Sequence, residues 1–119
     1  MNIRECYEKL NGDYEDVISR LGSDSLTEKF VNKFLNDRTY DLLKQAVSTG
    51  DIHESFRAAH TLKGVAANLS FTELYDNASK LTEQLRPLTE PADEELLSDV
   101  DLSYSKVISV ITDYFNNKH

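Results

Sequence analysis

The sequence predicts an all-α fold, an antiparallel up-down four-helix bundle with short additional helices at its N-terminus. Only four glycines and two prolines interrupt the 119 residues. Apolar residues recur at spacings of three and four, which is the period of a helix with one buried face, and runs of alternating apolar and polar residues are absent from the sequence. Because the loops between the periodic segments are short, consecutive helices should lie antiparallel within a single domain, residues 1–119.

The N-terminal part of the chain predicts three helices. The first spans about 2–10 and ends in the turn "NGD", and the second spans about 13–21 and ends at Gly22. Ser25 and Glu28, in "SLTE", form a capping-box pattern that predicts the start of the third. The residues that this third helix offers to a core are Leu26, Phe30, Phe34 and Leu35.

The first two helices of the bundle follow. A helix at about 39–48 is terminated by "STGD", and Asp51 with Glu54 predicts the start of the next. The apolar face of the 39–48 helix consists of Leu42, Leu43, Ala46 and Val47.

Two more helices complete the predicted bundle. Ser70 with Glu73, in "SFTE", predicts the start of a helix that Pro87 ends. Pro91 lies near the start of a long final helix, where the missing N–H costs little. Its apolar residues are Leu96, Leu97, Val100, Val107, Ile108, Ile111, Tyr114 and Phe115.

Charge and composition exclude several classes of function. The 13 Lys and Arg against 21 Asp and Glu give a net charge of -8, which disfavours binding to nucleic acid or to an anionic membrane surface. The opening "MNIRECYEKL" carries charges in place of an apolar signal-peptide core, and no run reaches the ~18 apolar residues of a spanning helix. The one cysteine, Cys6, is interpreted as a packed helix residue in a reducing compartment. We therefore expect a cytoplasmic protein without membrane insertion.

The stretch "AAHTLKGVAANLSF", residues 58–71, contains the candidate site. On a helix of 3.6 residues per turn, His60 lies well away from the centre of the apolar face. Phe56 lies at the border, and the residues close to the direction of His60 are His53, Arg57, Lys63, Gly64 and Ala67. The apolar face consists of Ala59, Leu62, Ala66 and Leu69, with Ile52 and Val65 at its margins.

The combination of His60, Lys63 and Gly64 indicates a nucleophile that is accessible to a large partner. Glycine in an exposed helix interior costs roughly 1 kcal/mol relative to alanine, so its presence suggests a need for bare backbone beside the imidazole. An imidazole with the unperturbed pKa of about 6.5 supplies a nucleophilic nitrogen near neutral pH. The alternative is that His60 is an ordinary solvated or core-satisfied histidine.

These residues resemble the histidine-containing phosphotransfer (HPt) domain family. "HTLKG", preceded by "AA" and followed by a run of apolar and small residues to "NL", is similar to the family's signature. "FVNKFLND", "LLKQAVSTGD" and "LYDNASKLTEQLR" resemble the neighbouring helices, so that the resemblance covers roughly residues 13–86. The family commonly has glycine where this chain has Ser70.

The resemblance implies a role for each residue of the motif. His60 is the phosphorylated residue, Lys63 supports the phosphoryl group and Gly64 permits close approach of the partner. In the family, a polar side chain from the following helix often hydrogen-bonds the histidine. Thr82 holds the matching position here, although its side chain is short, and it is also a candidate for contact with a partner.

Further residues are candidates for contact with a partner. Phe56 could be an apolar docking contact or a core residue. Arg57 makes the face locally more basic, Ala67 leaves room for loops of the partner, and Arg86 could meet an acidic rim or be solvated. His53 is interpreted as solvated.

The implied function is that of a phosphocarrier in a multistep two-component phosphorelay. His60 would accept a phosphoryl group from one receiver-domain aspartate and donate it to another, as a covalent intermediate. The expected partners are response-regulator receiver domains and a hybrid sensor histidine kinase. We expect the chain to act as a monomer. A direct substrate of a histidine kinase is a variant of this hypothesis, and a non-catalytic helical adaptor is the alternative from another class.

No enzyme site is expected in the chain itself. The sequence has no glycine-rich phosphate loop and no room for a nucleotide-binding kinase module. His53, His60 and His119 lack the spacing of metal ligands. We therefore expect no cofactor bound by this chain, and magnesium on the partner receiver domain.

Overall fold

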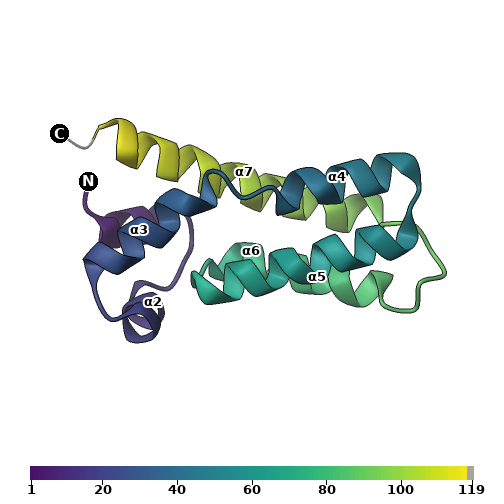
Figure 1. The fold of residues 1–119 in the computed structure, drawn as a ribbon, viewed down its shortest axis with the longest axis horizontal. Helices are drawn as coiled ribbons and strands as arrows, with labels where there is room; N and C mark the ends of the chain where they lie inside the picture. Colours follow the sequence, from purple (N-terminus) through teal and green to yellow (C-terminus); the bar gives the residue numbers. More distant parts are fainter. Residues whose placement is uncertain (118–119) are drawn as a thin grey trace.

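Seven helices make up most of residues 1–117, the part of the chain that the computed structural model describes, and this part contains no strand (Figure 1). The helices are α1 Ile3–Lys9, α2 Tyr14–Leu21, α3 Asp24–Phe34, α4 Thr39–Thr49, α5 Ile52–Asn68, α6 Thr72–Leu85 and α7 Glu94–Asn116. The predicted all-α class is confirmed, and His119 lies outside the described residues.

Helices α4 to α7 form the bundle, with α5 packed between α4 and α6, and α6 packed against α7. Short turns reverse the chain between α4, α5 and α6, so that these helices are antiparallel (Figure 1). Tyr40 connects α4 to α7: its ring stacks on Tyr104, with centroids 4.0 Å apart, and its hydroxyl donates a hydrogen bond to Asp101. The four helices therefore enclose a common core.

The three N-terminal helices lie at one end of the bundle, beside the last turns of α7 (Figure 1). They are joined to the α5–α6 turn by several hydrogen bonds. The buried hydroxyl of Tyr7 donates to the carbonyl of Leu69 at 2.7 Å, and the backbone N–H of Asp13 donates to the carbonyl of Ser70 at 2.9 Å. The hydroxyl of Ser70 donates to Asp16 at 2.6 Å. We call this set of contacts the N-terminal clasp.

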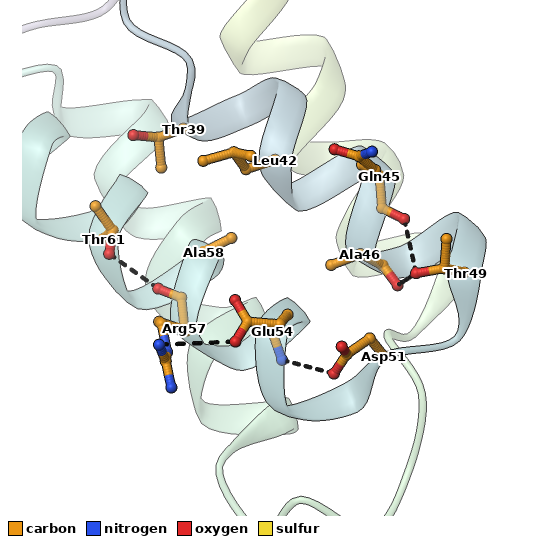
Figure 2. A pocket seen from close by; sticks show the side chains of 10 residues that line it. All are labelled: Thr39, Leu42, Gln45, Ala46, Thr49, Asp51, Glu54, Arg57, Ala58 and Thr61. Carbon is orange, nitrogen blue, oxygen red and sulfur yellow. Dashed lines mark hydrogen bonds and ion pairs between the residues drawn. The ribbon is translucent and has the colours of Figure 1, made fainter.

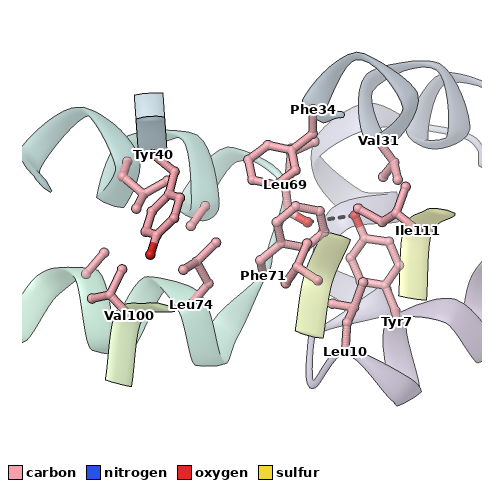
Figure 3. Packing of buried hydrophobic residues seen from close by; sticks show 14 of the residues in the cluster. Tyr7, Leu10, Val31, Phe34, Tyr40, Leu69, Phe71, Leu74, Val100 and Ile111 are labelled. Carbon is pink, nitrogen blue, oxygen red and sulfur yellow. Dashed lines mark hydrogen bonds between the residues drawn. The ribbon is translucent and has the colours of Figure 1, made fainter. Parts of the chain in front are cut away.

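Burial of apolar side chains explains this arrangement. Around the clasp, Tyr7 packs against Phe71 and Phe71 packs against Phe34, with ring centroids 5.7 and 5.2 Å apart (Figure 3). This aromatic contact joins the N-terminal helices to the bundle core in one continuous cluster. Large aromatic rings contribute much of the apolar area that stabilises a small domain.

Helix starts were predicted with mixed success. The side chain of Asp51 accepts a hydrogen bond from the backbone N–H of Glu54, which confirms the predicted start of α5. The prediction for Ser25 was wrong: Ser23 is the N-cap of α3 and accepts from the backbone N–H of Leu26. The prediction for Ser70 was also wrong, because the N-cap of α6 is the next residue and makes no side-chain capping bond.

Three of the predicted core residues are exposed. Leu26, Phe30 and Leu42 keep 43%, 39% and 52% of their surface accessible. The apolar stripe that these helices turn to the core is narrower than the sequence pattern indicated: the predicted residues Phe34 and Leu43 are buried, and Val31, which was not predicted, is buried with them. A helix at the edge of a small bundle has too few neighbours to cover a wide apolar face.

Candidate functional site

Helix α5 presents His60 to solvent because its opposite side fills the core. Ala59, Leu62 and Ala66 are completely buried, and His60 is exposed on the other side of the helix. The prediction of an exposed imidazole part-way along one bundle helix is therefore confirmed.

The ring of Phe56 lies one turn before His60 and contacts it. The two ring centroids are 5.9 Å apart, at an interplanar angle of 38°. Phe56 is half-buried and also packs against the hydrophobic core, so it combines the core and surface roles that the sequence left open. A side chain held in this way restricts where the imidazole beside it can move.

A shallow depression surrounds the imidazole, between α5 and the end of α6. The guanidinium of Arg86 lies over the ring of Phe56, 5.4 Å from its centroid, a geometry that favours a cation–π contact. Arg57 borders the same depression from α5. The residues that line the depression are His53, Phe56, Arg57, His60, Thr61, Arg86 and Leu88.

Glu83 adds a negative charge to this surface, and the sequence analysis missed it. Nε of Arg86 donates to one carboxylate oxygen of Glu83 at 2.7 Å, and Nη2 donates to the other at 3.2 Å. This hydrogen bonding lowers the pKa of the Glu83 carboxyl below its ordinary value, and the charges of Lys63 and His60 lower it further. The Glu83 carboxylate is therefore held beside Arg86, which lines the depression around the imidazole. The spacing of three residues between Glu83 and Arg86 was the signal that could have revealed the pair.

One turn after His60, the surface of α5 has no side chain at Gly64. Gly64 is exposed, has ordinary helical backbone, and a Cβ added to it would meet nothing within 4 Å. Lys63 and Ala67 are half-buried. A partner can therefore approach the backbone at Gly64 without displacing any side chain.

The interpretation of Thr82 as a partner contact was wrong. Its side chain is completely buried, and its hydroxyl donates to the carbonyl of Ala78 at 2.7 Å, one turn back on α6. The side of α6 that packs against α5 is rotated so that Thr82 points inward, while Glu83 and Arg86 remain exposed.

A second groove lies between α4 and α5, and it shares Arg57 and Thr61 with the depression around His60 (Figure 2). The guanidinium of Arg57 pairs with Glu54 at 3.7 Å, and both side chains are largely exposed. The hydroxyl of Thr61 donates to the carbonyl of Arg57 at 3.0 Å. Of the candidate residues, Phe56, Arg57 and Arg86 line the depression with His60. Lys63, Gly64 and Ala67 follow His60 along α5 and are exposed or half-buried, whereas Thr82 is buried.

Other kinds of site find no support within residues 1–117. No group of three His, Cys, Asp or Glu side chains there could hold a metal ion. Cys6 is buried, and burial raises the pKa of its thiol to about 11, which disfavours the reactive thiolate. No described helix is both long enough and apolar enough to cross a membrane.

Comparison with protein families gives one match, to the Hpt domain over residues 35–110. This segment contains all of α4, α5 and α6 and most of α7, together with His60 and every exposed candidate residue. The chain belongs to the Hpt domain family. Hpt domains take part in histidine phosphotransfer within phosphorelays; they are phosphocarriers without a kinase module and interact with receiver domains and kinases. Comparison with curated proteins and with solved structures gave no match.

Proposed function

We propose that this chain carries a phosphoryl group on His60 between the aspartates of two receiver domains in a multistep phosphorelay. The observation that carries the proposal is the exposed imidazole on α5, bordered by Lys63 and the bare backbone of Gly64, in a chain of the Hpt family. A hybrid sensor kinase would supply the phosphoryl group through its own receiver domain. The chain would act as a monomer in the cytoplasm.

The chemistry requires little from this chain beyond a nucleophile in the right place. One nitrogen of the neutral imidazole attacks the phosphorus of the receiver's aspartyl phosphate, while the other nitrogen keeps its hydrogen. The N–P bond forms, the acyl O–P bond breaks, and the aspartate leaves as a carboxylate, so atoms and charge balance. Donation to the next receiver reverses these steps.

Alignment and charge neutralisation dominate the rate of such a transfer. Lys63, one turn after His60, could reach the phosphoryl oxygens and offset their charge. Magnesium, held by the acidic pocket of the receiver, would supply the remaining positive charge, and this chain would bind no cofactor.

Docking would use the surface around the imidazole. Arg57 and Arg86 supply positive charge on a chain whose net charge is -8, which suits the acidic rim of a receiver pocket. Phe56 offers an apolar contact, and Gly64 with Ala67 leaves space for the receiver's loops.

The test is to incubate the protein with phosphorylated receiver domains and to measure acid-labile, alkali-stable phosphate on it. The wild type should accept phosphate, and His60→Gln should accept none. Because His60 is exposed, His60→Gln should change the free energy of unfolding by no more than about 0.5 kcal/mol.

His53→Gln is the matched control, since His53 is a second exposed histidine of α5 that lines the same depression. It should accept phosphate as the wild type does. Phosphate on His60→Gln would show that the wrong residue was chosen. A wild type that binds receivers without accepting phosphate would instead support the adaptor alternative.

A further inference from the structure

We infer that Glu83 makes His60 a better phosphoryl donor, by competing with the phosphoryl group for the cations beside it. This inference rests on the proposed function. It concerns the equilibrium between phosphate on His60 and phosphate on the aspartate of the receiver. Its basis is the ion pair that Glu83 forms with Arg86 at the edge of the imidazole's depression.

In the unphosphorylated protein, Arg86, whose guanidinium lies over the ring of Phe56, already has Glu83 as its ion-pair partner. Two nitrogens of Arg86 donate to the two oxygens of Glu83, while the guanidinium lies over Phe56, which in turn contacts His60. In this ion pair the negative charge of Glu83 offsets the positive charge of Arg86. Lys63 also acts electrostatically on the same carboxylate.

Phosphorylation changes the charge at the centre of this group of residues. A neutral imidazole becomes a phosphorylated ring, and the site gains at least one negative charge whether or not the ring proton is later released. Arg86 and Lys63 are then attracted both by the phosphoryl oxygens and by Glu83.

The pair of Glu83 and Arg86 is weak enough for this competition. The two side chains are 57% and 51% exposed, and exposed ion pairs contribute little to stability. The phosphoryl group, with up to two negative charges, is the stronger partner for a guanidinium. Glu83 therefore raises the free energy of the phosphorylated state relative to the resting state, which favours transfer onward to a receiver.

The chain provides a matched control on α5. Glu54 and Arg57 have the same spacing and form an exposed ion pair at 3.7 Å, and Arg57 also borders the depression. Glu54→Gln changes the net charge by the same amount as Glu83→Gln. Unlike Arg86, however, Arg57 does not place its guanidinium over the ring of Phe56.

The experiment compares the wild type, Glu83→Gln and Glu54→Gln after each is phosphorylated with phosphoramidate. Each protein is then mixed with a receiver domain that accepts phosphate from the wild type, and the split of phosphate between the two proteins is measured at equilibrium. Glu83→Gln should retain about two- to fivefold more phosphate relative to the receiver, the range expected for one exposed charge interaction. The difference should shrink as salt is raised, since salt screens exposed charges.

Two outcomes would contradict the inference. Equal retention by Glu83→Gln and the wild type would show that the carboxylate does not act on the phosphorylated state. An equal increase in Glu54→Gln would show that the effect is not specific to the pair of Glu83 and Arg86. A wild type that takes up no phosphate at His60 from phosphoramidate or from a receiver would contradict the proposed function itself, which is a separate result.

Arg86→Gln extends the test in the opposite direction. With this cation absent, Glu83 remains and the phosphoryl group loses a partner, so the receiver should hold a larger share of the phosphate than with the wild type. A share unchanged from the wild type would show that Arg86 does not contact the phosphoryl group. The melting temperature of each variant, measured on the same preparation, reports any structural effect separately.

Discussion

Gly12 and Gly64 lie in two regions with opposite requirements. A Cβ at Gly12 would lie 2.7 Å from the ring of Tyr7 and 2.9 Å from both Leu10 and the carbonyl of Ser70, whereas a Cβ at Gly64 would meet nothing within 4 Å. The first glycine permits the close approach of the N-terminal clasp to the α5–α6 turn. The second contributes no packing that the fold needs.

This difference separates the part of the chain that maintains the fold from the part that is open to a partner. The clasp combines buried hydrogen bonds with aromatic contacts and joins the N-terminal helices to the end of α5. The surface around His60, nearer the middle of the same helix, is exposed and hydrogen-bonded only locally. The clasp fixes the end of α5, which helps to hold the imidazole in position. The exposed face of α5 at Gly64 leaves room for a partner to approach it.

The largest effect on stability should come from Gly12→Ala. The added methyl group would overlap a backbone carbonyl as well as two side chains, and a backbone atom cannot move aside cheaply. We expect the free energy of unfolding to fall by about 1–3 kcal/mol, the usual cost of overpacking. Urea unfolding measures it, and an unchanged midpoint would show that the clasp is loosely packed.

Tyr7→Phe should have the next largest effect. The Tyr7 hydroxyl is buried, burial raises its pKa, and it therefore stays protonated and donates to the carbonyl of Leu69. Removing the hydroxyl leaves that carbonyl without this donor, which should cost about 1–2 kcal/mol of unfolding free energy. The same urea titration applies, and a variant as stable as the wild type would argue that this hydrogen bond contributes nothing to the clasp.

Gly64→Ala should have the smallest effect, and of opposite sign. Alanine is the better helix former and Gly64 has open space around it, so the free energy of unfolding should rise by up to about 1 kcal/mol. A destabilised Gly64→Ala would place this glycine in the same class as Gly12 and remove the contrast between the two regions.

Two features that depend on local sequence, the start of α5 and the exposure of His60, were predicted correctly, whereas the cap of α3 was placed two residues too late. Asp51 caps α5 because its carboxylate needs only a backbone N–H three residues away. The exposure of His60 follows from its angle relative to the apolar residues of its own helix. Neither depends on the rest of the chain.

Tertiary contacts decided two of the features that were predicted wrongly. Ser70 matches an N-cap pattern, but it has a φ of 56° and its hydroxyl donates to Asp16, a residue far away in the sequence. This left-handed backbone also gives a physical reason for the glycine that the family commonly has at this place. Thr82 was assigned to the surface wrongly and Glu83 was missed, because packing fixes the rotation of α6 against α5 and neighbouring residues on a helix differ by about 100° in direction.

The most direct test of the central claim, that the open face of α5 serves docking and not folding, is Gly64→Gln. Its melting temperature and its rate of phosphate acceptance from a phosphorylated receiver should be measured on the same preparation. Ser109→Gln, at an exposed position of α7, is the control for a long polar side chain on a helix surface. Reacting groups must come within about 3–3.5 Å, and a displacement of about 1 Å can cost a hundredfold in rate. We therefore predict a nearly unchanged melting temperature and a rate lower by up to about a hundredfold for Gly64→Gln, with a normal rate for Ser109→Gln. A normal rate in Gly64→Gln, or its unfolding, would contradict the account.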